Sequence, residues 1–165
     1  MFKKEFFIFI LVVCVAALLY WWYFKPPSNP MEKVKFQTED GKTKELSDFR
    51  GKVVVLSYFQ SWCSDCRREL PELLALQKTV GGEDVLTIIM VSDENWDKIN
   101  IVKNIANSPN LEFLQSTETL KSLGIKRYPT TYLLDKSGKE IKVDVEGIYW
   151  NNPEIIQIIN KINQK

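Results

Sequence analysis

Residues 53–80 read VVVLSYFQSWCSDCRRELPELLALQKTV. The first seven residues are β-branched, aromatic or aliphatic apart from Ser57, so both faces of this segment are apolar. That pattern is typical of a central strand covered on both sides. Residues 64–80 are rich in helix formers and are followed by two glycines, which predicts a helix that ends there. Cys63 and Cys66 therefore stand where a buried strand gives way to a helix.

A Cys-x-x-Cys pair at the start of a helix is typical of a redox-active dithiol. The unpaired N–H groups of the helix terminus favour a thiolate, and two intervening residues let the sulfurs approach to bonding distance. A structural disulfide and half of a zinc site are the other interpretations. Zinc needs about four ligands, whereas the chain has no His and only one further Cys, Cys14. A disulfide in so short a loop restricts the unfolded chain little, so the redox interpretation is favoured.

The composition narrows the possible functions. The 165 residues suit one domain plus an appendage, and 45% hydrophobic residues with a net charge of +1 argue against disorder and against a nucleic-acid partner. The lack of His excludes Ser-His-Asp and Cys-His catalysis and any imidazole metal ligand. We therefore expect no metal and no bound cofactor, with the Cys63–Cys66 pair as the redox group.

The N-terminus forms a separate segment. Residues 6–24 contain no charge, and at about 1.5 Å per residue a helix over them would cross most of a bilayer core. Lys3 and Lys4 precede this run, and the aromatic residues 20–23 lie at its far end. The pattern predicts an uncleaved transmembrane signal anchor over residues 1–24.

A cleaved signal peptide is the alternative for this segment. Residues 15–17 form a passable cleavage site, but bulky apolar residues follow it. Cys14 could suggest lipid attachment, although Val13 is too large for a good lipobox, and within a membrane Cys14 is a small hydrophobe. An anchor places the rest of the chain on the extracytoplasmic (periplasmic) side, where disulfides persist. Residues 25–32 are proline-rich and predict a stiff linker to a domain over residues 33–165.

Strand and helix patterns alternate along this domain. Besides the central strand and its helix, which Pro71 should kink, further elements are expected. The predicted strands are 34–38, 42–46, 85–91, 111–114, 130–134 and 140–145, and the predicted helices are 94–106, with Asp93 as its cap, 117–123 and 153–162. This order predicts an α/β fold with a mixed central β-sheet flanked by helices.

Two separated segments carry a family resemblance. Residues 51–69 place Gly-Lys-Val-Val-Val before Ser-Trp-Cys-Ser-Asp-Cys-Arg-Arg-Glu, and residues 124–130 read GIKRYPT. Pro71 follows five residues after the second cysteine. Over about residues 33–161 the chain resembles the thioredoxin superfamily, and within it the membrane-anchored TlpA/ResA-like thiol-disulfide oxidoreductases. The resemblance implies a thioredoxin-like fold.

The resemblance also implies roles for individual residues. Cys63 would be the attacking thiol and Cys66 the resolving one. Pro129 would be a cis-proline whose neighbours Tyr128 and Thr130 dock the substrate chain by β-type pairing. Trp62 would pack over the site. An ordinary trans turn at Pro129 and a half-buried core aromatic at Trp62 are the alternatives.

Carboxylates near the dithiol are expected to tune it. Anchored members of the family carry a Glu at the position of Glu69, where it adjusts thiol acidity; a surface Glu paired with a nearby Arg or Lys is the alternative. Thioredoxins have a buried Asp where this chain has Ser57. Ser64 and Asp65 depart from the common Gly-Pro and Glu-Pro pairs, which puts the redox potential in question.

The predicted function is a membrane-anchored protein-disulfide reductase that acts on cysteine-containing protein substrates, for instance in cytochrome c maturation. A membrane thiol-disulfide electron donor would reduce it. Thiol exchange runs in both directions, so a disulfide oxidase or isomerase is an alternative. A peroxiredoxin-like antioxidant is another, and a non-catalytic docking module of a membrane assembly is an alternative from a different class.

Overall fold

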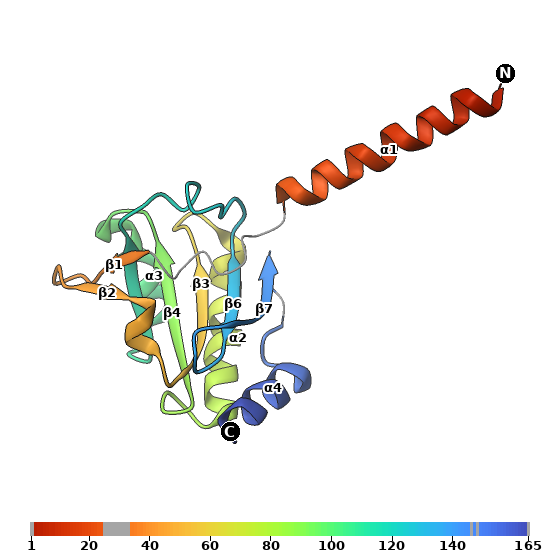
Figure 1. Ribbon diagram of the computed structural model, residues 1–165. Helices are drawn as coiled ribbons and strands as arrows, with labels where there is room; N and C mark the ends of the chain where they lie inside the picture. The colour runs from red at the N-terminus through yellow and green to blue at the C-terminus, as the bar shows by residue number, and fades with distance from the viewer. Residues whose placement is uncertain (1, 25–33, 146, 148, 165) are drawn as a thin grey trace.

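The described part of the chain consists of one long helix and an α/β domain. The computed structural model describes residues 2–24, 34–145, 147 and 149–164. Helix α1 (Phe2–Phe24) projects away from the domain (Figure 1). The predicted linker, residues 25–32, lies outside the described residues. The proposed domain boundaries therefore remain expectations.

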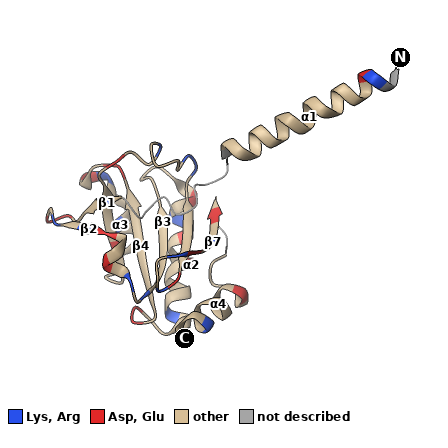
Figure 2. Cartoon of the chain, viewed as in Figure 1, with Lys and Arg blue, Asp and Glu red and all other residues tan. Residues whose placement is uncertain are grey.

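Helix α1 contains the predicted membrane span. Residues 4–23 have a mean hydropathy of 2.4 and none of this window is buried within the protein, so the helix is long and apolar enough to cross a membrane. Among the residues of α1, charges occur only near its N-terminal end, at Lys3, Lys4 and Glu5. Figure 2 shows the rest of the helix without charged residues. An exposed apolar surface of this kind is compatible with a lipid environment, since water would leave the apolar side chains unfavourably hydrated.

Strand β3 (Val53–Tyr58) lies inside the sheet and is buried at every position, as its two apolar faces predict. It pairs with β4 (Leu86–Ser92) in parallel and with β6 (Thr130–Leu134) in antiparallel orientation. The sheet has seven strands in the order β2-β1-β5-β4-β3-β6-β7. The predicted mixed central sheet is confirmed.

The outer strands extend the sheet on both sides. On one side β5 (Leu111–Ser116) pairs with β4 in parallel, and the hairpin of β1 (Lys35–Gln37) and β2 (Thr43–Glu45) follows it. On the other side β7 (Glu140–Val145) pairs with β6. Strands β3 and β4 are parallel neighbours, so the loops that follow them emerge at the same end of the sheet.

Three helices cover one face of the sheet: α2 (Ser64–Val80), α3 (Trp96–Ala106) and α4 (Pro153–Asn163). Their apolar side chains form one core cluster with Val53 and Val55 of β3. The other face is covered by a short 3₁₀ helix (Leu46–Phe49) and by residues 120–125. Apolar side chains of both segments form one core cluster with Leu56 and Tyr58. Burial of these apolar surfaces fixes α2, and with it the dithiol, against the centre of the sheet.

The structure corrects two local predictions. Residues 117–123 do not form the predicted helix, because successive turns end at Gly124, whose φ of 83° belongs to the left-handed region. Helix α3 begins after Asn95 rather than at the predicted residue 94. The Asn95 side chain accepts a hydrogen bond from the Lys98 N–H at 3.2 Å. Asn95 is therefore the cap of α3, and the predicted capping role of Asp93 is wrong.

Candidate active site

Cys63 and Cys66 are joined by a disulfide at the start of α2, with Cα atoms 5.4 Å apart. Cys63 is the N-cap residue of this helix, and its sulfur accepts a hydrogen bond from the Cys66 N–H at 3.0 Å. The sulfur of Cys63 therefore lies at the positive end of the helix dipole. Cys63 is 5% exposed and Cys66 is 1% exposed, so both sulfurs are shielded and Cys66 is shielded more.

Glu69 lies one turn after Cys66 and is buried, with 3% of its surface exposed. The alternative of a surface Glu is therefore wrong. Ser57 of β3 contacts its Oε2 at 2.9 Å, and Thr131 of β6 contacts its Oε1 at 2.9 Å. The indole N–H of Trp150 donates to Oε1 at 2.8 Å. Three segments distant in sequence thus converge on one carboxyl group.

Burial raises the pKa of Glu69, and the nearby carboxylate of Asp144 adds to this shift. Hydrogen bonds from Ser57, Thr131 and Trp150 oppose it in part. A carboxylate transferred from water into such surroundings loses hydration that these donors only partly replace. The neutral acid is therefore favoured over a wider pH range than in a solvated Glu.

The hydroxyl contacts support the same conclusion. Ser57 Oγ and Thr131 Oγ1 are also 2.8 Å apart, so Glu69 and the two hydroxyls form a triangle of oxygen–oxygen contacts. Two hydroxyl protons can occupy only two of its sides. A proton on the carboxyl group of Glu69 would fill the third side and complete the ring of hydrogen bonds.

The Tyr128–Pro129 peptide bond is cis, as the resemblance implies. Tyr128 packs edge-to-face against Trp62 with ring centroids 5.9 Å apart. Trp62 is 69% exposed, so the alternative of a half-buried core aromatic is wrong. Pro129 is buried, and Gly147 lies close to its ring: a Cβ atom added to Gly147 would lie 3.6 Å from the Pro129 Cγ, within van der Waals contact. The two aromatic rings form an apolar surface beside the dithiol.

Thr130 does not face the surface. It is 2% exposed, and its hydroxyl donates to the Arg127 carbonyl at 2.7 Å. Any contact of Thr130 with a substrate would therefore involve its main chain. Its neighbour Thr131 is equally buried and reaches Glu69 instead.

Ser64 and Asp65 lie between the cysteines on the outer side of α2. The Ser64 hydroxyl is 3.3 Å from an Asp65 carboxylate oxygen, and the same carboxylate forms an ion pair with Arg68. Arg67 donates to the Ser61 carbonyl at 2.8 Å. The Asp65 carboxylate therefore lies near the dithiol, and its ion pair with Arg68 offsets part of its charge.

Sequence reasoning missed several residues of this site. Trp150 lies far along the chain in an irregular segment, where no pattern indicates a partner for Glu69. Thr131 is one residue beyond the GIKRYPT segment, and the alternation of strand side chains could have separated it from Thr130. Among the described residues, no group of three or more His, Cys, Asp or Glu side chains is placed to hold a metal ion.

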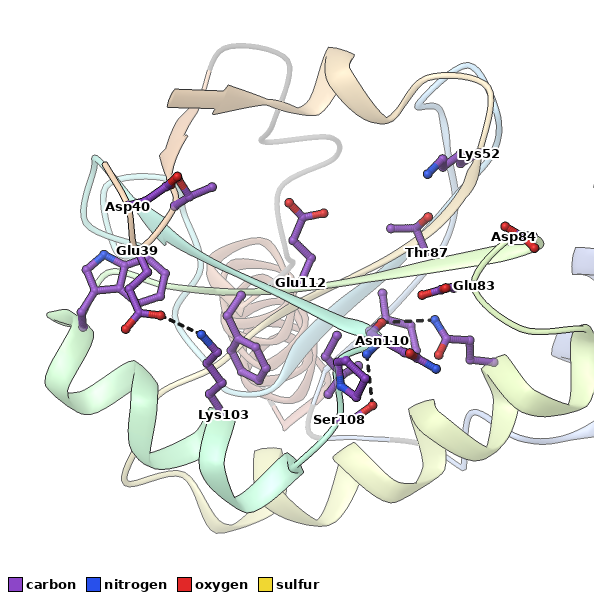
Figure 3. A pocket seen from close by; sticks show the side chains of 17 residues that line it. Glu39, Asp40, Lys52, Glu83, Asp84, Thr87, Lys103, Ser108, Asn110 and Glu112 are labelled. Atoms are coloured by element: carbon purple, nitrogen blue, oxygen red, sulfur yellow. Dashed lines mark hydrogen bonds and ion pairs between the residues drawn. The ribbon is translucent and has the colours of Figure 1, made fainter. Parts of the chain in front are cut away.

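The structure also contains a cavity of about 700 Å³ (Figure 3). It is lined by the hairpin tip at Glu39 and Asp40, by Lys103 of α3, by Glu112 of β5 and by the turn that carries Glu83. The Glu39 carboxylate and Lys103 form an ion pair of 2.7 Å across it. None of its described lining residues belongs to the predicted site.

The family model described as Redoxin matches residues 26–159. The chain belongs to the Redoxin family. This agrees with the resemblance to TlpA/ResA-like proteins of the thioredoxin superfamily. A thiol-disulfide oxidoreductase ResA of Bacillus thuringiensis subsp. konkukian is 33% identical to this Redoxin chain over 112 residues. The match covers 66% of the chain and 62% of ResA, which is less than two thirds of that protein's length.

Solved structures of related proteins share the fold. The exposed lipoprotein thioredoxin Etrx1 of Streptococcus pneumoniae is 28% identical, with a TM-score of 0.55, and the match covers 77% of this chain and 97% of Etrx1. The thioredoxin domain of a thiol-disulfide oxidoreductase from Bacteroides vulgatus is 24% identical, with a TM-score of 0.63 and coverages of 83% and 98%. The predicted thioredoxin-like fold of this Redoxin member is thus confirmed.

Proposed function

We propose that the protein is a membrane-anchored thiol-disulfide oxidoreductase that reduces disulfides of protein substrates. The observation that carries the proposal is the Cys63–Cys66 disulfide at the N-terminus of α2, together with a cis peptide bond before Pro129. Both lie at the same end of the sheet, because Thr130 pairs with Tyr58 at the end of β3 that leads to Cys63. The similarity to ResA supports the same chemistry. The exposed ring of Trp62 beside Tyr128 provides a surface on which a protein chain can dock.

The reaction begins with the reduced dithiol. The Cys63 thiolate attacks one sulfur of the substrate disulfide, forms a mixed disulfide and releases the first substrate sulfur as a thiolate. The Cys66 thiolate then attacks the Cys63 sulfur, which restores the Cys63–Cys66 bond and releases the second substrate sulfur. Two electrons pass to the substrate, and the two protons lost by the cysteines balance those taken up by the substrate thiolates.

Reduction of insulin tests this function. The full-length protein in detergent, with dithiothreitol as electron source, is expected to accelerate the cleavage of insulin disulfides above the rate with dithiothreitol alone. A variant with Ser at both Cys63 and Cys66 is the control and should give only the rate of dithiothreitol alone. No acceleration by the wild-type protein would contradict the proposed function.

The substrate and the electron donor follow from the proposed location. A dithiol outside the cytoplasmic membrane meets proteins whose cysteines oxidise there, so a candidate role is to keep cysteines reduced for haem attachment in cytochrome c maturation. After each cycle the Cys63–Cys66 disulfide must itself be reduced. A membrane protein that carries a dithiol is the proposed donor, because cytoplasmic reductants do not reach this side.

Residues 1–24 are expected to stay attached as a single-pass anchor, with the domain on the extracytoplasmic side. The apolar helix α1 and the exposed aromatic residues at its end support this topology. Mass spectrometry of the membrane-extracted protein should give the N-terminus encoded by the gene, and protease added to spheroplasts should digest the domain. A chain that starts near Leu18, or a protected domain, would contradict the topology.

A further inference from the structure

Two consecutive carboxylates, Asp93 and Glu94, follow directly after β4 at the end of the sheet that carries the dithiol. Neither residue acts as the cap of α3, since Asn95 does. Both side chains instead reach the loop that leads from β3 to Cys63. These two carboxylates therefore serve the loop before Cys63 rather than the N-terminus of α3.

Glu94 holds Ser61, which lies two residues before Cys63. One carboxylate oxygen accepts the Ser61 N–H at 2.5 Å and the other accepts the Ser61 hydroxyl at 2.8 Å. The remaining polar group of Ser61, its carbonyl, accepts from Arg67 at 2.8 Å. The side chain of Gln115 binds the Glu94 carbonyl at 3.0 Å, so Glu94 is itself fixed to β5. Charge-assisted hydrogen bonds of this kind are among the stronger ones in proteins.

Asp93 connects the same loop to the segment that leads to the cis-proline. One of its oxygens accepts from the Gln60 side chain at 2.6 Å, and the other accepts the Leu120 N–H at 2.8 Å. The Gln60 side chain is in turn hydrogen-bonded to Tyr128. The Gln60 carbonyl accepts the Cys63 N–H at 3.0 Å, which links this network to the dithiol.

We propose that Asp93 and Glu94 are positioning residues that hold the loop 60–62 and the segment 120–129 together as the two walls of the protein-substrate site. Trp62 comes from the first wall and Tyr128 from the second, and their ring centroids lie 5.9 Å apart. The carboxylates thus preorganise the docking surface without touching the reacting sulfurs. This inference rests on the proposed function.

The test compares a protein disulfide with a small one. Fully reduced full-length protein is mixed in separate experiments with insulin, which needs the docking surface, and with hydroxyethyl disulfide, which is too small to use it. Loss of two charge-assisted hydrogen bonds should loosen the loop 60–62. Glu94→Ala is therefore expected to lower the rate constant for insulin about tenfold while that for hydroxyethyl disulfide stays within about twofold.

Two further variants separate positioning from charge and from stability. Glu94→Gln can accept the Ser61 N–H and donate to the Ser61 hydroxyl, so it should restore the insulin rate to within about twofold of wild type. Glu83→Ala removes an exposed acid at the opposite end of β4 and should change neither rate. If Glu94→Ala fails to fold, Ser61→Ala removes one of the two contacts and should lower the insulin rate about threefold.

The possible outcomes are distinct. An equal loss of both rates in Glu94→Ala would show a general structural role, and an unchanged insulin rate would show that the contact is irrelevant. A Glu94→Gln variant as impaired as Glu94→Ala would assign the effect to charge. Each of these results would overturn the inference. A wild-type protein that reduces neither disulfide would instead overturn the proposed function itself.

Discussion

Replacing Cys66 with Ser is expected to convert the protein into a trap for its substrates. Cys63 can still form the mixed disulfide, but the sulfur that resolves it is gone. Replacing Cys63 with Ser should give no trapped species and should lower insulin reduction to the background rate. The asymmetry follows from the position of Cys63 at the N-terminus of α2, since the thiolate there is the better stabilised nucleophile.

Non-reducing electrophoresis of membranes that contain each variant measures this directly. Cys66→Ser should give additional bands that disappear with dithiothreitol, and Cys63→Ser should give none. Cys14 needs a control, because it is exposed on α1 and could form disulfides of its own. Both variants should therefore carry Cys14→Ala. Equal trapping by the two variants would show that the roles of Cys63 and Cys66 are assigned wrongly.

Replacing Glu69 is expected to have the largest effect on stability. Glu69→Ala leaves the Trp150 indole and the hydroxyls of Ser57 and Thr131 without their shared partner inside the core. The two hydroxyls can still bond each other at 2.8 Å, so the Trp150 N–H and one hydroxyl proton are left unpaired. At about 1–3 kcal/mol for each, the free energy of unfolding should fall by about 3 kcal/mol. Denaturation in urea at pH 7 measures this loss, and a loss below about 1 kcal/mol would contradict the role of Glu69 as the centre of the network.

Glu69→Gln tests the protonation state separately. Burial raises the pKa of Glu69 in the folded protein above the ordinary value of 4.5, so the folded state binds more protons than the unfolded chain. The wild-type protein therefore loses stability as the pH rises from 4.5 through the folded pKa. Gln mimics the neutral acid and lacks this loss. The difference in unfolding free energy between Glu69→Gln and wild type should grow with pH, by about 1.4 kcal/mol for each unit of the shift.

Urea denaturation of both proteins between about pH 4.5 and pH 8 gives this difference at each pH. The subtraction removes the contribution of other acids whose pKa values are lowered, such as Asp40 and Asp135. A difference that stays constant over this range would show that Glu69 titrates normally. A difference that shrinks as the pH rises would show that the donors lower its pKa overall.

The sequence predicted the scaffold of the site well because the signals were local and strong. The buried strand 53–58 and the helix 64–80 follow from apolar alternation and from the two glycines that end the helix. Glu69 could be placed one turn after Cys66, but its burial could not be derived. Trp150, whose indole N–H the Glu69 carboxyl group accepts, lies 81 residues along the chain from Glu69. Only the folded sheet and helices bring these two residues together.

Local reasoning was misleading where tertiary contacts compete for the same residue. Asp is a residue type that often caps helices, and Asp93 precedes an amphipathic segment. Its carboxylate nevertheless binds the Gln60 side chain and the Leu120 N–H. Residues 117–123 have helix formers but are too few to propagate a helix, and Gly124 closes the turn. Both errors lie in segments that the Asp93 carboxylate joins to Gln60, in the loop before Cys63.

The reduction potential of the Cys63–Cys66 pair is the most direct test of the reductase assignment. The helix N-terminus favours a thiolate at Cys63 over one at Cys66, but the burial of Cys63, which is 5% exposed, and the nearby Asp65 carboxylate oppose that stabilisation. Strong oxidants of this fold depend on a stabilised thiolate. Equilibration of the full-length protein with glutathione or dithiothreitol buffers should give a potential nearer to about −270 mV than to about −120 mV. A potential above about −180 mV would contradict the assignment and identify an oxidase or isomerase.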